Sequence, residues 1–183
     1  MPQTDLSSYN NHPYHPGGNL LKRLFWLYIN AIVFNNSLLP FNGLKVLLLR
    51  LFGAKIGKKV TIKPCVNIKY PWFLSVGDNT WIGENVWIDN LLMITIGKNV
   101  CLSQGVVLLT GSHNYKKSTF DLITGSIVLE DGVWIGALAV VNQGITAASH
   151  AVLATGSIAT KNLDAYSVYQ GNPAVKVRSR VVE

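Results

Sequence analysis

His113 is the residue in this sequence best suited to acid–base chemistry. It lies in a polar segment, residues 111–126, that also contains Tyr115 and is too long for a tight turn. Imidazole exchanges a proton close to neutral pH, so a histidine held in a loop on a rigid scaffold can act as a general base. We interpret the other histidines differently: His12 and His15 as residues of a polar tail, and His150 as a surface or core residue.

We do not expect a metal site. The two cysteines, Cys65 and Cys101, are too few for a disulfide framework or a cysteine-based zinc site, and we interpret both as small apolar residues in a reduced protein. A zinc site of the γ-carbonic anhydrase type needs three histidines. The repeats described next contain only His113 and His150.

The segment around His113 interrupts a repeat with a period of six. Aliphatic residues recur at every sixth position between Ile56 and Ala159, and several are followed directly by glycine, as in Ile135-Gly136. This period fits neither an amphipathic helix nor one long strand. It is typical of a solenoid in which each hexapeptide forms one short strand and one corner. We therefore predict an all-β solenoid over residues 55–166, a parallel β-helix of about five triangular coils.

The interruptions of the repeat all fall at one place in the coil. Three hexapeptides make one coil of eighteen residues, yet Ile56 and Val76 are 20 residues apart, and Ile96 and Leu129 are 33 apart. The additional residues always follow the third hexapeptide, so they should leave the solenoid at the same corner. Insertions on one edge of a solenoid usually form its binding side. At this corner lie residues 70–73, Asp89 with Asn90, and the segment 111–126.

The segments outside the repeat have three different characters. Residues 1–19 are polar and read as a flexible leader without a cleavable signal, and residues 167–183 read as a short C-terminal tail. Residues 20–54 carry two apolar stripes at helical spacing, and no apolar run is long enough to span a membrane. We expect these helices to cap the open end of the solenoid. The stripes consist of Leu21, Leu24, Phe25, Tyr28 and Ile32, and of Leu44, Leu47, Leu48, Leu51 and Phe52.

The positive charge is concentrated at the N-terminal end. The chain has 183 residues, enough for one domain, and a net charge of +7. Nine basic residues and one acidic residue precede position 70, whereas the remainder carries a net charge of −1. Positive charge concentrated at one end of a chain indicates that this end contacts an anionic partner. We expect a cytoplasmic protein, with peripheral contact between the N-terminal helices and the inner face of the cytoplasmic membrane, and no nucleic-acid partner.

Three stretches resemble the hexapeptide-repeat O-acetyltransferases. Residues 129–178 resemble the C-terminal half of the maltose, galactoside and nodulation-factor acetyltransferases. Residues 48–57, 110–115 and 120–123 are more similar to the colanic-acid biosynthesis acetyltransferases. The resemblance implies a left-handed β-helix, a homotrimer and acetyl-CoA bound between neighbouring β-helices. It also implies that His113 removes a proton from a sugar hydroxyl, which attacks the thioester directly.

The resemblance further implies roles for individual residues. The acceptor sugar would contact the corner residues Asp89, Asn90 and Tyr115, and a backbone N–H near Gly136-Ala137 would bind the oxyanion. Val175 departs from the family pattern, because relatives often have a cation there, so Lys176, Arg178 and Arg180 would share the CoA phosphates differently. Ala148 and Ala154 replace glycines of the repeat. The residues matching CoA-site positions are Trp134, Gly136, Ala137, Thr155, Thr160, Lys161 and Arg178.

Several functions remain open at the level of the sequence. The favoured hypothesis is an acetyl-CoA-dependent O-acetyltransferase that modifies a saccharide in exopolysaccharide or capsule biosynthesis, with an acceptor that could be lipid-linked. The same fold also serves N-acetyltransferases that act on amino sugars and O-acetyltransferases that act on serine. A non-catalytic scaffold or an ice-binding surface is the alternative of another class. Ice binding is disfavoured because the outward positions lack regular threonine rows.

Overall fold

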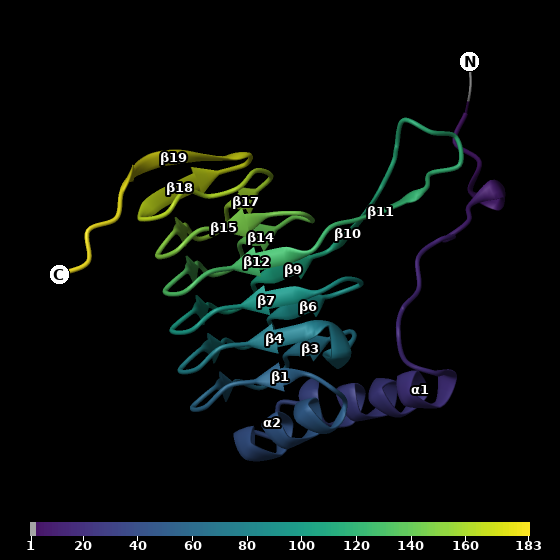
Figure 1. The fold of residues 1–183 in the computed structure, drawn as a ribbon, viewed down its shortest axis with the longest axis horizontal. Helices are drawn as coiled ribbons and strands as arrows, with labels where there is room; N and C mark the ends of the chain where they lie inside the picture. Colours follow the sequence, from purple (N-terminus) through teal and green to yellow (C-terminus); the bar gives the residue numbers. More distant parts are fainter. Residues whose placement is uncertain (1–2) are drawn as a thin grey trace.

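The computed structural model describes residues 3–183. A parallel β-solenoid stands on helices at its base, and an arm projects from one of its corners (Figure 1). No helix in the described part of the chain has the length and apolarity needed to cross a bilayer. The helices are η1 (Leu6–Ser8), α1 (Leu20–Ile29), the π-helical η2 (Asn30–Phe34), α2 (Asn42–Leu51) and η3 (Pro71–Phe73).

Three parallel sheets form the sides of the triangular coil. The first side contains β1 (Lys55–Ile56), β4 (Leu74–Val76), β7 (Ile94–Ile96), β12 (Ile127–Leu129) and β15 (Thr146–Ala147). The second contains β2 (Thr61–Ile62), β5 (Trp81–Ile82), β8 (Cys101–Leu102), β13 (Trp134–Ile135), β16 (Val152–Leu153) and β18 (Ser167–Gly171). The third contains β3 (Asn67–Ile68), β6 (Trp87–Asp89), β9 (Val107–Leu109), β14 (Val140–Val141) and β17 (Ile158–Ala159). We number the corners likewise, the third corner leading from the third side into the next coil.

The solenoid has about six turns rather than the five that the sequence predicts. After β17, Leu163 forms a parallel bridge to Ala147, and β18 then pairs with β16 as a further strand of the second side. The sequence conceals this incomplete coil because Leu163, its first inward residue, follows Ala159 by four positions instead of six, although Tyr169 then follows Leu163 by six. The last strand, β19 (Ala174–Ser179), turns back and runs antiparallel to β18.

The predicted six-residue pattern is confirmed as the interior of the solenoid. Side chains that repeat from coil to coil, such as Ile62, Ile82 and Leu102, are at most 1% exposed. Each such side chain contributes about 1.5–3 kcal/mol through the apolar surface that it removes from water. The glycines that follow them allow adjacent coils to approach, because a Cβ on Gly77 would lie 2.5 Å from the carbonyl carbon of Gly97.

The corners require a backbone conformation that few residues prefer. At the first corner, one residue in each of the first five coils has a φ between 54° and 72°, in the left-handed region. Asparagine and glycine tolerate this conformation well, and Asn79, Asn99 and Gly132 supply it in the middle coils. Lys59 and His150 occupy the same corner in the first and fifth coils. His150 is thus a corner residue, and its ring stacks on Tyr166 with centroids 4.7 Å apart.

The helices cap the first coil as predicted, although the apolar stripes do not face it. Trp26 Nε1 donates to the carbonyl oxygen of Ile68 at 2.8 Å, and the buried Lys45 Nζ donates to that of Lys63 at 2.9 Å. These side chains satisfy carbonyl groups on the open edge of the solenoid. Most stripe residues point away from the coils and are exposed; these are Leu21, Leu24, Phe25, Tyr28, Ile32, Leu44, Leu47 and Leu51.

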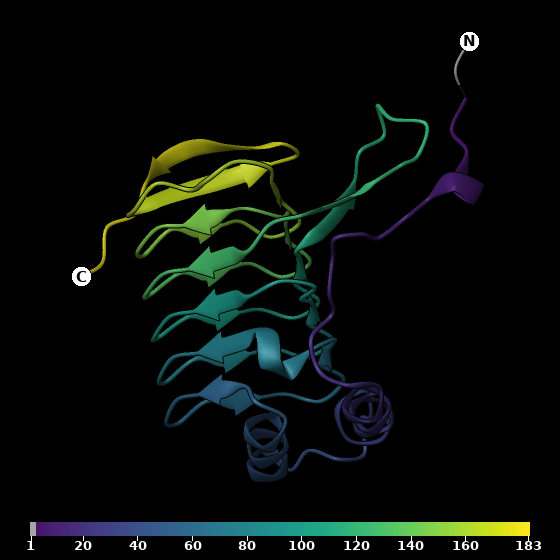
Figure 2. The same ribbon diagram turned by 45° about the vertical axis from the view of Figure 1, so that its right-hand side comes forward.

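The N-terminal segment runs along the third corner and reaches the arm (Figure 2). Trp72 Nε1 donates to the carbonyl oxygen of Pro16 at 2.9 Å, which attaches the segment to the corner. Farther along, the N–H of Asp5 donates to the carbonyl oxygen of Ser118 at 2.8 Å. Residues 3–19, which the sequence predicts as a leader, therefore connect the helical base to the arm.

Candidate active site

His113 lies at the start of the arm. The arm leaves the third corner of the third coil as β10 (Gly111–His113) and returns as β11 (Leu122–Thr124), with His113 opposite Leu122 in an antiparallel pair. The insertions before it, at residues 70–73 and 89–93, open at the same corner two coils and one coil below, respectively. The prediction that all insertions share one corner is confirmed.

Phe120 determines the orientation of the His113 ring. Nδ1 of His113 is 3.0 Å from the carbonyl oxygen of Phe120, and the two rings stack with centroids 4.4 Å apart and an interplanar angle of 9°. A carbonyl oxygen can only accept, so Nδ1 must carry the proton that it donates. In the neutral ring, Nε2 therefore carries the lone pair. This is the arrangement that a general base requires.

The rest of the arm is closed by its own polar contacts. The N–H of Asn114 donates to the carbonyl oxygen of Asp121 at 2.8 Å, and Lys117 Nζ lies 2.9 Å from the Asp121 carboxylate. Hydrogen bonds from Thr119 and Lys117 lower the pKa of the Asp121 carboxyl. Tyr9 of the N-terminal segment lies 5.6 Å from the His113 ring. Tyr115 is 77% exposed at the far end of the arm.

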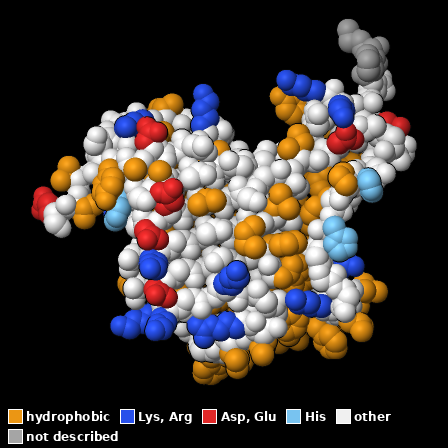
Figure 3. Space-filling view, in the orientation of Figure 1, with side chains coloured by type: hydrophobic (Ala, Val, Ile, Leu, Met, Phe, Trp, Pro, Cys, Tyr) orange, Lys and Arg blue, Asp and Glu red, His pale blue; other side chains and the backbone are white. Residues whose placement is uncertain are grey.

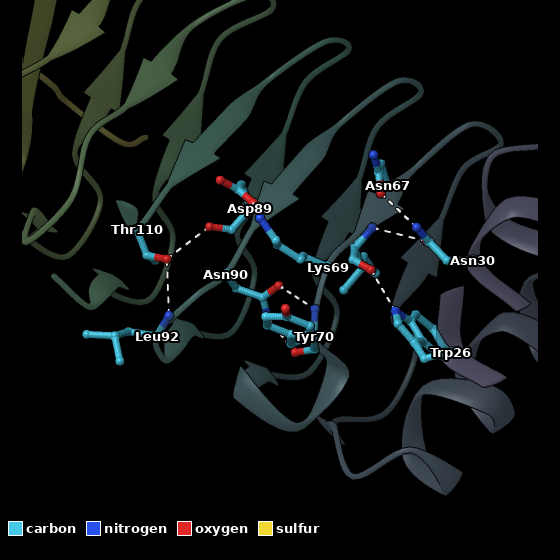
Figure 4. Close-up of polar contacts among 10 residues, drawn as sticks. Trp26, Asn30, Asn67, Lys69, Tyr70, Asp89, Asn90, Leu92 and Thr110 are labelled. Atoms are coloured by element: carbon cyan, nitrogen blue, oxygen red, sulfur yellow. Dashed lines mark hydrogen bonds and ion pairs between the residues drawn. The ribbon is translucent and has the colours of Figure 1, made fainter. Parts of the chain in front are cut away.

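Asp89 borders a cavity of about 520 Å³ between α1 and the third side of the first two coils. Its carboxylate is 2.9 Å from Lys69 Nζ, and Figure 4 shows the pair beside the corner. The volume is within the range of small-ligand sites. Aromatic, amide and charged side chains line the cavity together, among them Arg23, Trp26, Asn30, Asn67, Lys69 and Trp87.

Two buried polar atoms near Asp89, Tyr14 Oη and Arg23 Nε, lack a hydrogen-bond partner among the described residues. The buried Asp89 Oδ1 has only its ion pair with Lys69. Burial, followed by the nearby Tyr70 and Asp89, raises the pKa of the Tyr14 hydroxyl. Buried polar groups are normally paired, so this cluster fits a ligand that offers both donors and acceptors. Sequence reasoning missed Tyr14 and Arg23, because no local pattern connects them to the third corner.

Asn90, in contrast with its neighbour Asp89, has a structural role. Its side chain is fully buried, and Oδ1 accepts from the N–H of Tyr70 at 2.9 Å (Figure 4). Its Nδ2 donates to the carbonyl oxygens of Tyr70 and Phe73. The Asn90 amide thus makes its hydrogen bonds to the backbone at the third corner of the coil below. The expected contact between Asn90 and an acceptor does not agree with this burial.

Four of the predicted CoA-site residues lie on the second side or at the second corner that follows it. Trp134 is 46% exposed on the second side, and its Nε1 donates to Ser103 Oγ at 3.0 Å. The N–H of Gly136 is used in the ladder, where it donates to Leu153. The N–H of the half-buried Ala137 makes no hydrogen bond to another described residue, so it is free to donate to a ligand. Thr155, at the same corner one coil above, is exposed.

The remaining predicted residues lie elsewhere. Thr160 and Lys161 are exposed at the third corner, two coils above the arm, and Arg178 is exposed on β19 opposite Val168. Arg180 is held by the fold, because its Nη1 donates to the carbonyl oxygens of Gly132 and His150. One chain thus places His113 and the residues around Ala137 at different corners. No group of three metal-ligating side chains occurs within residues 3–183.

Comparisons with known proteins reveal strong similarity to acetyltransferases. No family model matches the chain. It is 39% identical over 177 residues to WcaF of Escherichia coli, named for acetyl transfer in colanic acid biosynthesis, with 97% of each chain covered. It is 30% identical over 128 residues to the galactoside O-acetyltransferase of the same organism, covering 68% of this chain and 63% of that protein. Among solved structures, a hexapeptide-repeat acetyltransferase from Vibrio cholerae in complex with acetyl-coenzyme A superposes with a TM-score of 0.79 at 28% identity, covering 88% of both chains.

Proposed function

Because the chain belongs to the hexapeptide-repeat acetyltransferases, we propose that it transfers acetyl from acetyl-CoA to a saccharide hydroxyl, with His113 as general base. The observation that carries the role of His113 is its hydrogen bond to Phe120, which leaves the lone pair on Nε2. By similarity to WcaF, the acceptor belongs to exopolysaccharide or capsule biosynthesis.

The proposed reaction is a direct transfer. Nε2 of His113 accepts the hydroxyl proton while the hydroxyl oxygen attacks the thioester carbonyl carbon. The N–H of Ala137 donates to the oxyanion that develops there. The carbon–sulfur bond then breaks, and the imidazolium returns its proton to the leaving CoA thiolate. No acyl-enzyme is formed, and no metal takes part.

We propose that the acceptor occupies the cavity beside Asp89. Sugars present many hydroxyl groups, each of which can both donate and accept, and this matches the unpaired Tyr14 and Arg23 atoms and the Asp89 carboxylate, which is paired with Lys69 alone. Trp87, which is 44% exposed at the cavity, provides an aromatic surface for the apolar face of a sugar ring.

We propose further that the active site is shared between subunits of a homotrimer. His113 and Ala137 lie at different corners of one chain, so a neighbouring copy is needed to bring a third corner against a second corner. Light scattering on the purified chain would test this. A monomeric mass at the concentration at which the enzyme is active would contradict it.

The test of the base is acetyl-CoA turnover by His113→Ala with a family of capsular and exopolysaccharide acceptors. We expect a loss of about 10²–10⁴-fold in kcat. The matched control is His150→Asn, which introduces at a corner the residue that Asn99 provides two coils earlier. A variant at position 113 within a few-fold of the wild type would overturn the role of His113. Products stable to mild alkali would indicate an amide, and hence an amino-sugar acceptor.

A further inference from the structure

The outer face of α1 is apolar. Its large side chains point away from the solenoid, and Phe25 is 63% and Tyr28 64% exposed, whereas Trp26 is the one residue of α1 that is fully buried. A helix that caps a soluble protein normally presents polar residues to water. Helix α1 has the reverse orientation, because Trp26 and Asn30, the first residue of η2, bind the coil, whereas the large apolar side chains of α1 face outward.

The exposed apolar surface continues over α2 and the loop before it. Leu38 is 83%, Phe41 63%, Leu47 54% and Leu51 70% exposed. Figure 3 shows hydrophobic side chains gathered along the lower edge of the molecule, where these helices lie. We call this surface, formed by the outward apolar side chains of residues 20–51, the basal patch. Contiguous exposed patches of this kind mark interaction sites.

Lysines surround the basal patch. The first coil has Lys58 and Lys59 at its first corner, Lys63 at its second and Lys69 at its third. Lys58, Lys59 and Arg50 line one groove with Leu47 of the patch, so cations and apolar side chains adjoin there. Lys69 is paired with Asp89, whereas the ammonium groups of Lys58, Lys59 and Lys63 have no carboxylate within 4 Å among the described residues.

Acidic residues are absent from this end of the chain. Residues 6–77 contain nine basic residues and no aspartate or glutamate. The acids begin in the second coil, where Asp78, Glu84 and Asp89 occupy the three corners directly above the lysines. The charge therefore changes sign within one coil spacing, and the base is the cationic end of the molecule.

We propose that the base docks on a bilayer surface that contains anionic lipid. The apolar side chains of α1 and α2 would enter the headgroup boundary, and the lysines of the first coil would contact lipid phosphates. A bilayer that contains anionic lipid complements both parts of this surface, the apolar centre and the cationic rim. A second copy docked base to base would bring the same lysines face to face, which is unfavourable.

The docked orientation would place the cavity at the membrane surface. Leu20, Leu24 and Leu27 belong to the basal patch and also line the cavity beside Asp89. A saccharide carried on a lipid could then enter the cavity while its lipid remained in the bilayer. This extension to a lipid-linked acceptor rests on the proposed function, whereas the docking itself does not.

The test is flotation of the full chain with phosphatidylcholine vesicles, with and without phosphatidylglycerol. We expect flotation only with the anionic lipid, and a weakening by added salt. Lys58→Gln and Lys63→Gln should each reduce binding about fivefold, since one basic residue near an anionic surface contributes roughly 1 kcal/mol. The matched control is Lys98→Gln, at the same corner position as Lys58 two coils away, which should bind like the wild type.

A second pair of variants tests the apolar centre. Phe25→Ser and Tyr28→Ser alter exposed side chains, so the fold should remain intact, and both should reduce flotation. Equal flotation with neutral vesicles, or an equal loss with Lys98→Gln, would overturn the proposal. A fall in molecular mass for Phe25→Ser without any vesicle binding would show instead that another copy covers the patch. Acetyl transfer to a soluble acceptor, measured in the same variants, reports separately on the proposed function.

Discussion

The carbonyl oxygen of Phe120 accepts a 3.0 Å hydrogen bond from Nδ1 of His113, while the ring of the same residue stacks on the imidazole. Phe120 has a φ of 51°, so its backbone is in the left-handed region. One residue thus fixes both the tautomer and the plane of the base. Phe120 is a positioning residue, since it acts through His113.

Replacing Phe120 tests this positioning. Phe120→Ala should lower kcat about ten- to a hundredfold by loosening the ring, with little change in the KM for acetyl-CoA. Phe120→Tyr keeps the stack and should restore most of the rate. Steady-state kinetics of the two variants checks the prediction. An alanine variant with normal kcat, or a tyrosine variant as slow as the alanine one, would contradict it.

Asn90 should matter for stability rather than for substrate binding. Asn90→Ala removes a buried amide and leaves the Tyr70 N–H and the Phe73 carbonyl, both part-buried, without this partner, which should lower the free energy of unfolding by about 2–3 kcal/mol. Urea denaturation measures this change. The control is Asn162→Ala, which removes one exposed hydrogen bond, to the N–H of Thr146, and should cost less than about 1 kcal/mol. Similar costs for both would show that burial of the Asn90 amide is unimportant.

A methyl group at Gly136 should separate two coils. Its Cβ would lie 2.6 Å from the backbone nitrogen of Thr155, so the fourth and fifth coils would have to move apart. Gly136→Ala should therefore destabilise the protein by about 1–3 kcal/mol and weaken acetyl-CoA binding. Gly43→Ala, where no atom lies within 4 Å, serves as the control for thermal unfolding and titration. Unchanged stability and affinity at position 136 would refute the tight contact.

Lys45 should make the free energy of unfolding depend on pH in the alkaline range. Burial lowers the pKa of its ammonium group, so the unfolded chain binds this proton at pH values where the folded chain has released it. The free energy of unfolding should accordingly rise with pH from neutral to about pH 10 relative to a Lys45→Met variant. Urea titrations of both proteins across that range measure the difference. Parallel curves would mean that Lys45 keeps its proton in the fold.

The sequence predicted the solenoid well because its signal is repeated. Each coil buries the same inward positions, so residues such as Ile82 and Leu102 report one geometry many times. The position of the insertions follows from simple counting, which placed His113 at the third corner. The partial sixth coil escaped the count because Leu163 follows Ala159 by four positions, which breaks the six-residue period.

Features that depend on single long-range contacts could not be predicted. Asp89 and Asn90 are both polar corner residues, and only the shape of the corner below, at residues 70–73, decides that one lines a cavity and the other is buried. Helices α1 and α2 are apolar on most sides, so their stripes did not indicate the face that touches the coil. The hydrogen bonds of Trp26 and Lys45 to carbonyl groups at the edge of the solenoid decide which face of each helix touches the coil.

The return of β19 along β18 also limits how the protein can assemble. A parallel solenoid has open edges at both ends, onto which further chains could stack into a fibre. Helices cover the lower end, and at the upper end β19 covers the second side, carrying Lys176 and Arg178 on its exposed strand. Charged residues on an edge strand disfavour further pairing. The helices at one end and β19 at the other therefore both oppose the pairing of further strands. Copies of the protein can associate side by side, but their solenoids cannot stack end to end into a fibre.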